Sequence, residues 1–328
     1  MGRRRRSDGP ELDGVLLVDK PAGPTSHDVV QRVRRAAGQS RVGHTGTLDP
    51  AATGVLVVCL GRSTKLVRFL QAGTKTYAAR MVLGVETASQ DADGEVVART
   101  PAAHVDERAF CEALTAFRGE IAQTPPMVSA VKVGGQRLHE LARRGEEVER
   151  EARQVTVHDL VLDRFDTTRG DHPEASFLVT CSAGTYVRTL AHDVGRRLGV
   201  GGSLTALRRV ANGPFTEDEA VTLDELEGAV ADGGVAARLV DPATALARVL
   251  PVVAVDDRDL VARLTQGGRL PATGHDGPVA VRWGRHLVGV YRDASGEARP
   301  ELVWLRPEEL AAIEAPDAAP SHDDRDRR

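Results

Sequence analysis

The sequence predicts a mixed α and β fold with a small β-rich domain at its C-terminal end. Short apolar runs typical of buried strands alternate with stretches whose apolar residues recur at helical spacing. From Leu250 onward, short apolar segments are separated by Gly and Asp turns, which is typical of a small β domain. A chain of 328 residues is long enough for two domains with a sizeable core.

Each element of the larger part follows from such a pattern. Strands are expected at residues 14–19, 55–60 and 75–84, together with a hairpin turn at 87–94 and a strand that ends near Gly184. Helices are expected after a cap at Thr25 or Ser26, at 66–70, at 106–119, at 140–153 and from near Thr185. The Ala- and Val-rich residues 228–249 are expected to form helices that lead to a domain boundary.

The predicted domain organisation has four parts. A basic arm (1–11) and a charged tail (313–328) are expected to be disordered, and they enclose a large domain (12–248) and a small β domain (249–312). The small domain is expected to contain strands at 279–283, 287–291 and 301–305.

The charge is unevenly distributed along the chain. The net charge is −4, yet residues 20–80 hold ten Lys or Arg and two acids, and residues 181–210 hold five Arg and one Asp. Two basic segments in a mildly acidic protein indicate a surface for a polyanion such as nucleic acid. The alternative, two solvated helix faces, fits the charge pattern equally well.

Composition excludes several classes of protein. No apolar run approaches the roughly 18 residues of a membrane span, and the arginine-rich N-terminus is not followed by the apolar segment of a signal peptide. The three cysteines are too widely spaced to predict a zinc site or a disulfide framework. These features predict a cytoplasmic protein without a bound metal.

The stretch Gly43–Leu56 holds one carboxylate, Asp49, among glycines, threonines and Pro50. Pro50 biases Asp49 toward an extended conformation, and the apolar run that follows predicts a buried strand. A carboxylate on a tight loop beside a rigid strand is well placed for chemistry. An Asx-turn at an Asp-Pro corner is the alternative for the residues alone. A Walker-type phosphate loop is excluded because no Gly-Lys-Ser/Thr follows the glycines.

The string Gly-His-Thr-Gly-Thr-Leu-Asp-Pro-Ala-Ala-Thr-Gly-Val-Leu resembles the catalytic motif of the bacterial tRNA pseudouridine synthase B family. Further strings extend the resemblance over roughly residues 12–215; they lie at 20–26, 75–77, 123–132, 184–190 and 204–215. Three positions depart from the family pattern: Val128 and His139 stand where Tyr is common, and Ala183 stands where Lys is common.

The resemblance implies catalytic roles for three residues. Asp49 would be the catalytic carboxylate, and Tyr77 would stack on the target base and could accept a proton. Arg188 would pair with Asp49, orient it and keep it ionised, because a nearby cation lowers the pKa of a carboxylate. From the residues alone, Tyr77 could equally pack in a core, and Arg188 could be an exposed helical arginine.

The resemblance also implies four residues that contact or frame the substrate: His44, Tyr186, Leu207 and Lys20. His44 would occupy the space vacated by a flipped base, although a loop histidine without a role is the alternative. Lys20 belongs to the first motif of the family, which braces the catalytic loop. An exposed loop lysine is its alternative.

The resemblance implies a pseudouridine synthase fold, with a central and mainly antiparallel sheet, and a C-terminal RNA-binding domain of the PUA type. The implied reaction converts uridine 55 in the T arm of tRNA to pseudouridine without a cofactor, and the protein is expected to be a monomer without a protein partner. Two alternatives stay open: a non-catalytic tRNA-binding or RNA-folding protein, and a guide-RNA-dependent synthase that acts on ribosomal RNA.

Overall fold

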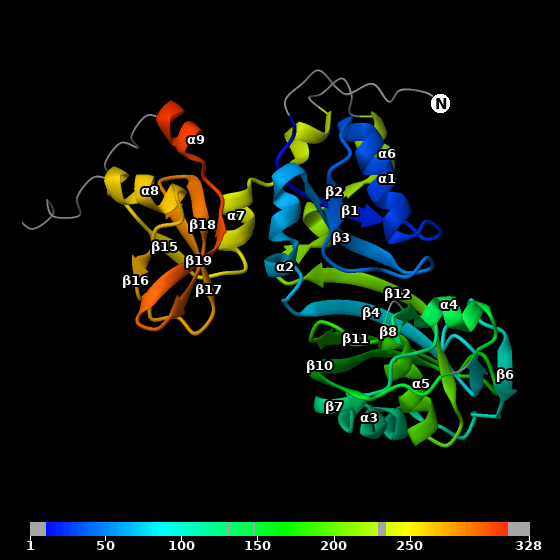
Figure 1. The fold of residues 1–328 in the computed structure, drawn as a ribbon. Coiled ribbons are helices and arrows are strands. Elements are labelled where there is room, and N and C mark those ends of the chain that lie inside the picture. Colours follow the sequence, from blue (N-terminus) through cyan, green and yellow to red (C-terminus); the bar gives the residue numbers. More distant parts are fainter. Residues whose placement is uncertain (1–10, 130, 147, 229–233, 314–328) are drawn as a thin grey trace, which may run out of the picture. The chain divides into compact units, whose positions relative to one another are not determined.

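The computed structural model describes residues 11–313 except 130, 147 and 229–233 (Figure 1). The chain divides into two compact units, Met1–Leu239 and Val240–Arg328. The sequence places the boundary after residue 248, whereas the units divide before helix α7 (Pro242–Ala247). This helix belongs to the second unit because its buried face packs against strands there. The predicted arm and tail lie outside the described residues, apart from Glu11 and Ile313.

The first unit is built on one large sheet in which most neighbouring strands are antiparallel, as predicted. The main path is β14-β1-β3-β12-β4-β11-β10-β7, with β2 on β3 and β13 on β12, and only the β1–β14 and β3–β12 pairs of this described sheet are parallel. The strands are β1 (Gly14–Lys20), β2 (Val42–His44), β3 (Thr53–Leu60), β4 (Lys75–Leu83), β7 (Gly119–Gln123), β10 (Arg153–Asp166), β11 (Glu174–Cys181), β12 (Gly202–Asn212), β13 (Phe215–Thr216) and β14 (Val221–Thr222).

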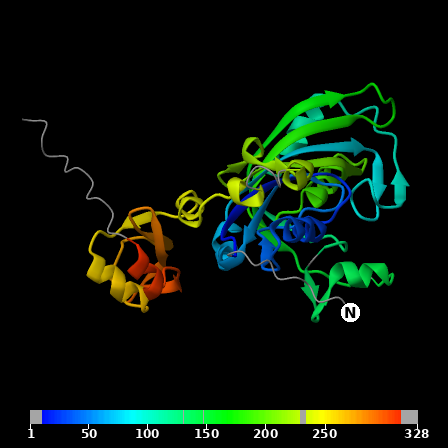
Figure 2. The same ribbon diagram turned by 90° about the horizontal axis from the view of Figure 1, so that it is seen from above.

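Helices and short hairpins surround this sheet (Figures 1 and 2). The helices are α1 (Ser26–Ala37), α2 (Val67–Leu70), α3 (Glu107–Thr115), α4 (Leu138–Arg143), α5 (Val187–Arg197) and α6 (Leu223–Gly228), with 3-10 turns η1 (Gly61–Leu66), η2 (Glu217–Glu219) and η4 (Gly234–Arg238). Two hairpins are β5 (Val85–Thr87) with β6 (Val96–Arg99), and β8 (Lys132–Val133) with β9 (Gln136–Arg137).

Two apolar cores hold the helices on the sheet. One lies between α1, α6 and strands β1 to β3, and the other lies between α3, α5 and strands β4, β10, β11 and β12. Helix α1 begins as predicted at Thr25, whose side chain and that of Asp28 form a reciprocal capping box. Strand β3 is buried along almost its whole length, as its continuous apolar run predicts.

One sequence prediction in this unit needs correction, and one central strand is not predicted. The helix expected at 140–153 is the shorter α4 (Leu138–Arg143), and Gly145, which follows it, has a left-handed backbone conformation. Strand β10 has already begun at Arg153. Mixed charge does not distinguish an exposed helix from an exposed turn. Strand β12 carries no apolar run in its C-terminal half, where Arg208 and Arg209 stand, so the sequence does not reveal it as a central strand.

The second unit is a five-stranded sheet with short helices, which confirms the predicted β-rich C-terminal domain. Its order is β15-β17-β18-β19-β16. The elements are β15 (Val252–Ala254), β16 (Leu270–Pro271), β17 (Pro278–Trp283), β18 (His286–Ala294), β19 (Glu297–Val303), α7, α8 (Arg258–Thr265) and α9 (Pro307–Ala312). Trp283 and Tyr291 are buried in its core. None of the helices in the described ranges is long and apolar enough to cross a membrane.

Candidate active site

The loop between β2 and β3 carries Asp49 and is hydrogen-bonded to the first residue of α1. Ser26, at the start of α1, accepts a hydrogen bond from the Leu48 amide at 2.8 Å and donates one to the Leu48 carbonyl at 2.9 Å. The Ala52 amide donates to the Asp49 carbonyl at 3.1 Å. Asp49 therefore projects from a loop whose backbone is fixed on both sides of it.

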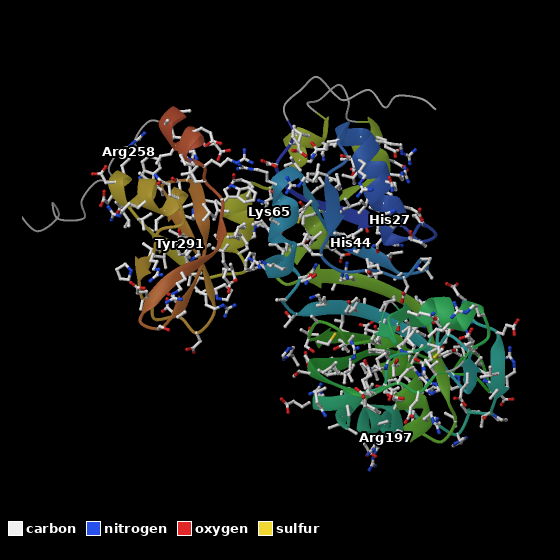
Figure 3. All side chains as sticks on the ribbon, viewed as in Figure 1. His27, His44, Lys65, Arg197, Arg258 and Tyr291 are labelled. Atoms are coloured by element: carbon white, nitrogen blue, oxygen red, sulfur yellow. The ribbon has the colours of Figure 1, made fainter. Side chains whose placement is uncertain are left out.

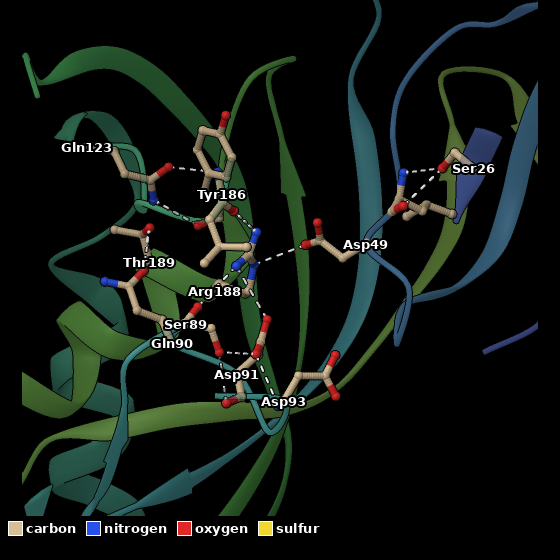
Figure 4. Close-up of polar contacts among 12 residues, drawn as sticks. Ser26, Asp49, Ser89, Gln90, Asp91, Asp93, Gln123, Tyr186, Arg188 and Thr189 are labelled. Atoms are coloured by element: carbon tan, nitrogen blue, oxygen red, sulfur yellow. Dashed lines mark hydrogen bonds and ion pairs between the residues drawn. The ribbon is translucent and has the colours of Figure 1, made fainter. Parts of the chain in front are cut away.

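The predicted pair between Asp49 and Arg188 is present (Figure 4). Nε of Arg188 lies 3.0 Å from Oδ2 of Asp49, and the arginine side chain is only 4% exposed, whereas that of Asp49 is 41% exposed. Arg188 is in the first turn of α5, which begins after Tyr186. Segments separated by more than a hundred residues thus meet at one ion pair.

Arg188 also binds groups that sequence reasoning missed. Its Nη1 lies 3.3 Å from Oδ2 of Asp91 and donates to the Ser89 carbonyl at 3.0 Å, and its Nη2 donates to the Val128 carbonyl at 2.8 Å. Asp91 in turn accepts hydrogen bonds from the Ser89 hydroxyl and from the amide of Asp93. The buried guanidinium is shared between two carboxylates, and a buried arginine is stabilised by such partners.

The electrostatics of Asp49 differ from the prediction. Its pKa is raised above the usual value, because burial of the carboxyl outweighs the opposing effect of Arg188, and the nearby Asp91 raises it further. Arg188 orients the carboxylate and favours its charged form, but it does not bring the pKa below the ordinary range.

Tyr77 lies on β4 and is 9% exposed, with Arg209 directly opposite it on β12. Burial raises the pKa of the Tyr77 phenol, whereas a hydrogen bond with Arg209 and the charge of Arg209 oppose this change. The phenol is therefore neutral at physiological pH in the free protein. Sequence reasoning treated Arg209 only as part of a matching motif.

A cavity of about 470 Å³ lies over these groups. Five of the seven predicted site residues line it: Asp49, Tyr77, Tyr186, Arg188 and Leu207. Tyr186 is fixed through its backbone, since its amide donates to the Gln123 side chain at 2.7 Å and its carbonyl accepts from that side chain at 3.0 Å. The cavity thus combines one carboxylate and two tyrosines with apolar side chains such as Leu207, and its cations are Arg68, Lys75, Arg188 and Arg209.

The other two predicted residues lie beside the cavity rather than on its wall. Nδ1 of His44 accepts a hydrogen bond from the Gly46 amide at 3.3 Å, and burial lowers the pKa of its imidazole. His27, at the start of α1, also lowers this pKa (Figure 3). His44 is therefore neutral at physiological pH, and it supports the catalytic loop by accepting the hydrogen bond from Gly46.

Lys20 is fully buried, and its Nζ donates to three carbonyls of the catalytic loop region, those of Pro21, Pro50 and Ala52, at 2.7–2.9 Å. Burial lowers its pKa to about 8. All three ammonium protons are used, so the geometry gives Lys20 a bracing role and leaves it nothing with which to contact a substrate.

The three departures from the family pattern lie in different surroundings. Val128 is exposed, and only its backbone carbonyl enters the site, where it accepts from Arg188. Ala183 is exposed and lines the cavity. The His139 side chain lies outside the described part of the structure.

Comparison with known proteins decides the family. The model of the TruB family pseudouridylate synthase N-terminal domain matches residues 34–187, and that of the tRNA pseudouridylate synthase B C-terminal domain matches residues 188–250. The tRNA pseudouridine synthase B of Thermobifida fusca is 47% identical over 299 residues, which is 89% of this chain and 98% of that protein. The chain belongs to the tRNA pseudouridine synthase B family.

Other members of the tRNA pseudouridine synthase B family match similarly; that of Symbiobacterium thermophilum is 51% identical over 81% of this chain and 86% of its own length. The fold resembles a chain in the crystal structure of a Cbf5-Nop10-Gar1 complex, with a TM-score of 0.70 and 29% identity over 90% of this chain and 86% of that one. A chain in an H/ACA RNP bound to a substrate RNA containing 2'-deoxyuridine gives a TM-score of 0.68 and 26% identity, over 90% and 87% of the two chains. These neighbours confirm a pseudouridine synthase fold.

Proposed function

We propose that the protein isomerises uridine 55 in the T arm of tRNA to pseudouridine. The observation that supports this most directly is the Asp49–Arg188 ion pair on the wall of a cavity that also holds Tyr77, in a chain of the tRNA pseudouridine synthase B family. A pure RNA-binding protein would gain nothing from a half-buried carboxylate aimed into a binding cavity, since a carboxylate repels the phosphate backbone.

The cavity is suited to a flipped base. A base in a folded RNA is stacked, and extruding it costs a few kcal/mol. The ring of Tyr77 offers a stacking surface worth about 1–3 kcal/mol, and Leu207 adds an apolar contact. Binding in the cavity thus offsets much of the cost of flipping.

The reaction breaks the N1–C1′ bond, rejoins the base to the sugar through C5 and releases the C5 proton, while N1 gains a proton. Asp49 stands where it could stabilise positive charge at C1′, form a covalent bond there or at the base, or assist loss of the C2′ proton. The ion pair with Nε of Arg188 uses Oδ2 of Asp49, so Oδ1 lies outside this pair and is the oxygen we assign to any of the three. No step requires an electron acceptor, so the reaction proceeds without a redox cofactor.

The role of Tyr77 depends on its protonation. If C2′ loses its proton to Tyr77, the phenol must first be deprotonated, which its raised pKa opposes in the free protein. Stacking needs no such change. We therefore propose that Tyr77 acts first as the stacking partner, and that any proton transfer to it occurs only in the substrate complex.

The remaining predictions belong to the same proposal. The second unit would act as a PUA-type RNA-binding domain, tRNA would be the only macromolecular partner, and the protein would act as a monomer in the cytoplasm. The titles of the structural neighbours name further proteins and an RNP. We propose that this chain needs neither, because the matched family members are named tRNA pseudouridine synthase B.

The test is release of tritium from uridine labelled at C5 in a modification-free tRNA transcript. Wild type should release one equivalent, a transcript with cytidine at position 55 should release none, and Asp49→Asn should release none while still binding tRNA. Binding by the wild type without release would support the RNA-binding alternative. Release only from ribosomal RNA in the presence of a guide RNA would support the guide-dependent one.

A further inference from the structure

Arg209 is a buried cation that the proposed reaction has not yet used. Its side chain is 1% exposed, and its guanidinium lies at the wall of the cavity. No residue in the described part of the structure provides a carboxylate partner for it, and the groups it contacts there are two backbone carbonyls and the phenol of Tyr77 on the facing strand. The cost of burying an arginine is usually reduced by a carboxylate.

The neighbouring arginine of the same strand shows the contrast. Arg208 points to the other face of β12 and pairs with Asp19 at 3.0 Å and with Glu217 at 2.6 Å. An arginine held only for structure would be expected to have such partners. We therefore look for the role of Arg209 in the groups that its guanidinium contacts.

The contacts of Arg209 join three elements. In the sheet it lies opposite Tyr77 of β4 on one side and Gly54 of β3 on the other. Its Nε donates to the Val55 carbonyl at 2.7 Å, and its Nη2 donates to the Gly46 carbonyl at 3.2 Å, three residues before Asp49. The planar fork of the guanidinium holds the two carbonyls at fixed separations, beside the facing Tyr77.

We propose that Arg209 is a positioning residue that fixes the phenol of Tyr77 relative to the loop that carries Asp49. The guanidinium of Arg209 contacts both the Tyr77 phenol and the loop that carries Asp49. It therefore sets the distance between the stacking ring and the carboxylate. Its charge also favours the ionised phenol, which couples the position of Tyr77 to its protonation. This inference rests on the proposed function for its catalytic consequence, but the contact itself can be measured separately.

The first measurement uses the full-length protein with carbon-13 at the tyrosine Cζ. The chain has three tyrosines, so three signals are expected, and Tyr77→Phe assigns the signal of interest. Arg209→Gln should shift the Tyr77 signal and move its titration to higher pH. Arg208→Gln is the matched control on the same strand and should leave both unchanged.

The second measurement is pseudouridine formation by the same variants. Arg209→Gln should lower kcat by about tenfold or more while KM changes by less than about threefold, because the groups are misplaced after the substrate has bound. Arg209→Lys keeps the charge but loses the fork, so it should restore the Tyr77 titration in part and kcat only weakly. If Arg209→Gln does not fold, the Tyr77 signal and kcat of Arg209→Lys are compared with those of the wild type instead.

The proposal is overturned if Arg209→Gln folds with wild-type kcat, or if its kcat falls while the Tyr77 signal and titration stay unchanged. In the latter case Arg209 has a structural role only. If the wild type forms no pseudouridine, the proposed function fails, and the tyrosine signals still decide whether Arg209 controls Tyr77.

Discussion

At the scale of single residues, the site depends on how one guanidinium is divided between two carboxylates. Arg188 binds Asp49 through Nε and Asp91 through Nη1, and two backbone carbonyls accept hydrogen bonds from Nη1 and Nη2. Asp91 holds the arginine in place, and at the same time its negative charge raises the pKa of Asp49. These two effects of Asp91 can be separated by experiment.

Replacing Asp91 by Asn should change both the rate and its pH dependence. The pKa of Asp49 should fall because a like charge is removed, so the acid limb of kcat against pH should move to lower pH. The rate at neutral pH should fall by about tenfold, equivalent to about 1.4 kcal/mol, because Arg188 loses one of its fixed partners.

Asp93→Asn is the control for this variant, since only its backbone amide binds Asp91. A profile of Asp91→Asn that matches the wild type in both position and height would show that Asp91 has no part in the site. The profile is obtained from initial rates of tritium release from acidic to neutral pH, so that the acid limb set by the raised pKa of Asp49 is covered.

At the scale of elements, the catalytic loop depends on the close parallel approach of β3 and β12. Gly54 is the second residue of β3 and has a φ of +99°. A Cβ atom there would lie 2.2 Å from the Arg209 carbonyl oxygen. Neither the backbone conformation nor the space admits a side chain. The requirement for glycine in the motif is thus explained by the strand pairing.

Gly54→Ala should therefore destabilise the first unit by about 3 kcal/mol, since strain and overlap with backbone act together. Thermal unfolding followed by circular dichroism measures the change. Gly73→Ala is the matched control, because a Cβ there would meet its nearest atom at 3.6 Å, an ordinary contact. Equal unfolding temperatures for the two variants would contradict the explanation.

The sequence predicted those elements whose signal is local. Buried β3 and capped α1 follow from runs and caps within a few residues. The motifs also brought Asp49 and Arg188 together correctly. By contrast, the roles of Asp91 and Arg209 depend on partners that are distant in sequence, and no local pattern distinguishes either from an exposed charged residue. The matching string at 204–215 includes Arg209 but gives it no role.

At the scale of the whole molecule, stability should depend on pH in a defined way. Burial lowers the pKa of Lys20 and of Lys75 to about 8 from 10.5. Between these values the unfolded chain binds more protons than the folded protein, so stability increases with pH. Burial raises the pKa of Cys59 to about 12 and of Cys181 to about 11 from 9.0, which has the opposite effect above pH 9.

The free energy of unfolding of the first unit should therefore rise between about pH 8 and pH 9 and level off or fall above that. Urea unfolding followed by circular dichroism at several pH values measures it, and Lys20→Met should reduce the slope. Both tryptophans lie in the second unit, so their fluorescence provides an internal control. A slope unchanged in Lys20→Met would contradict the assignment.

The position of β12 in the large sheet has a consequence for biosynthesis. Strand β12 separates β3 from β4, although it is made about 120 residues after β4. While the ribosome has released only the earlier part of the chain, the strands on either side of this gap cannot belong to one continuous sheet. The nascent chain therefore carries Asp49 and Tyr77 on separate, unjoined halves. We therefore expect catalytic competence only after residues 202–212 have left the exit tunnel, so a nascent chain that still lacks this strand in its sheet should not modify RNA.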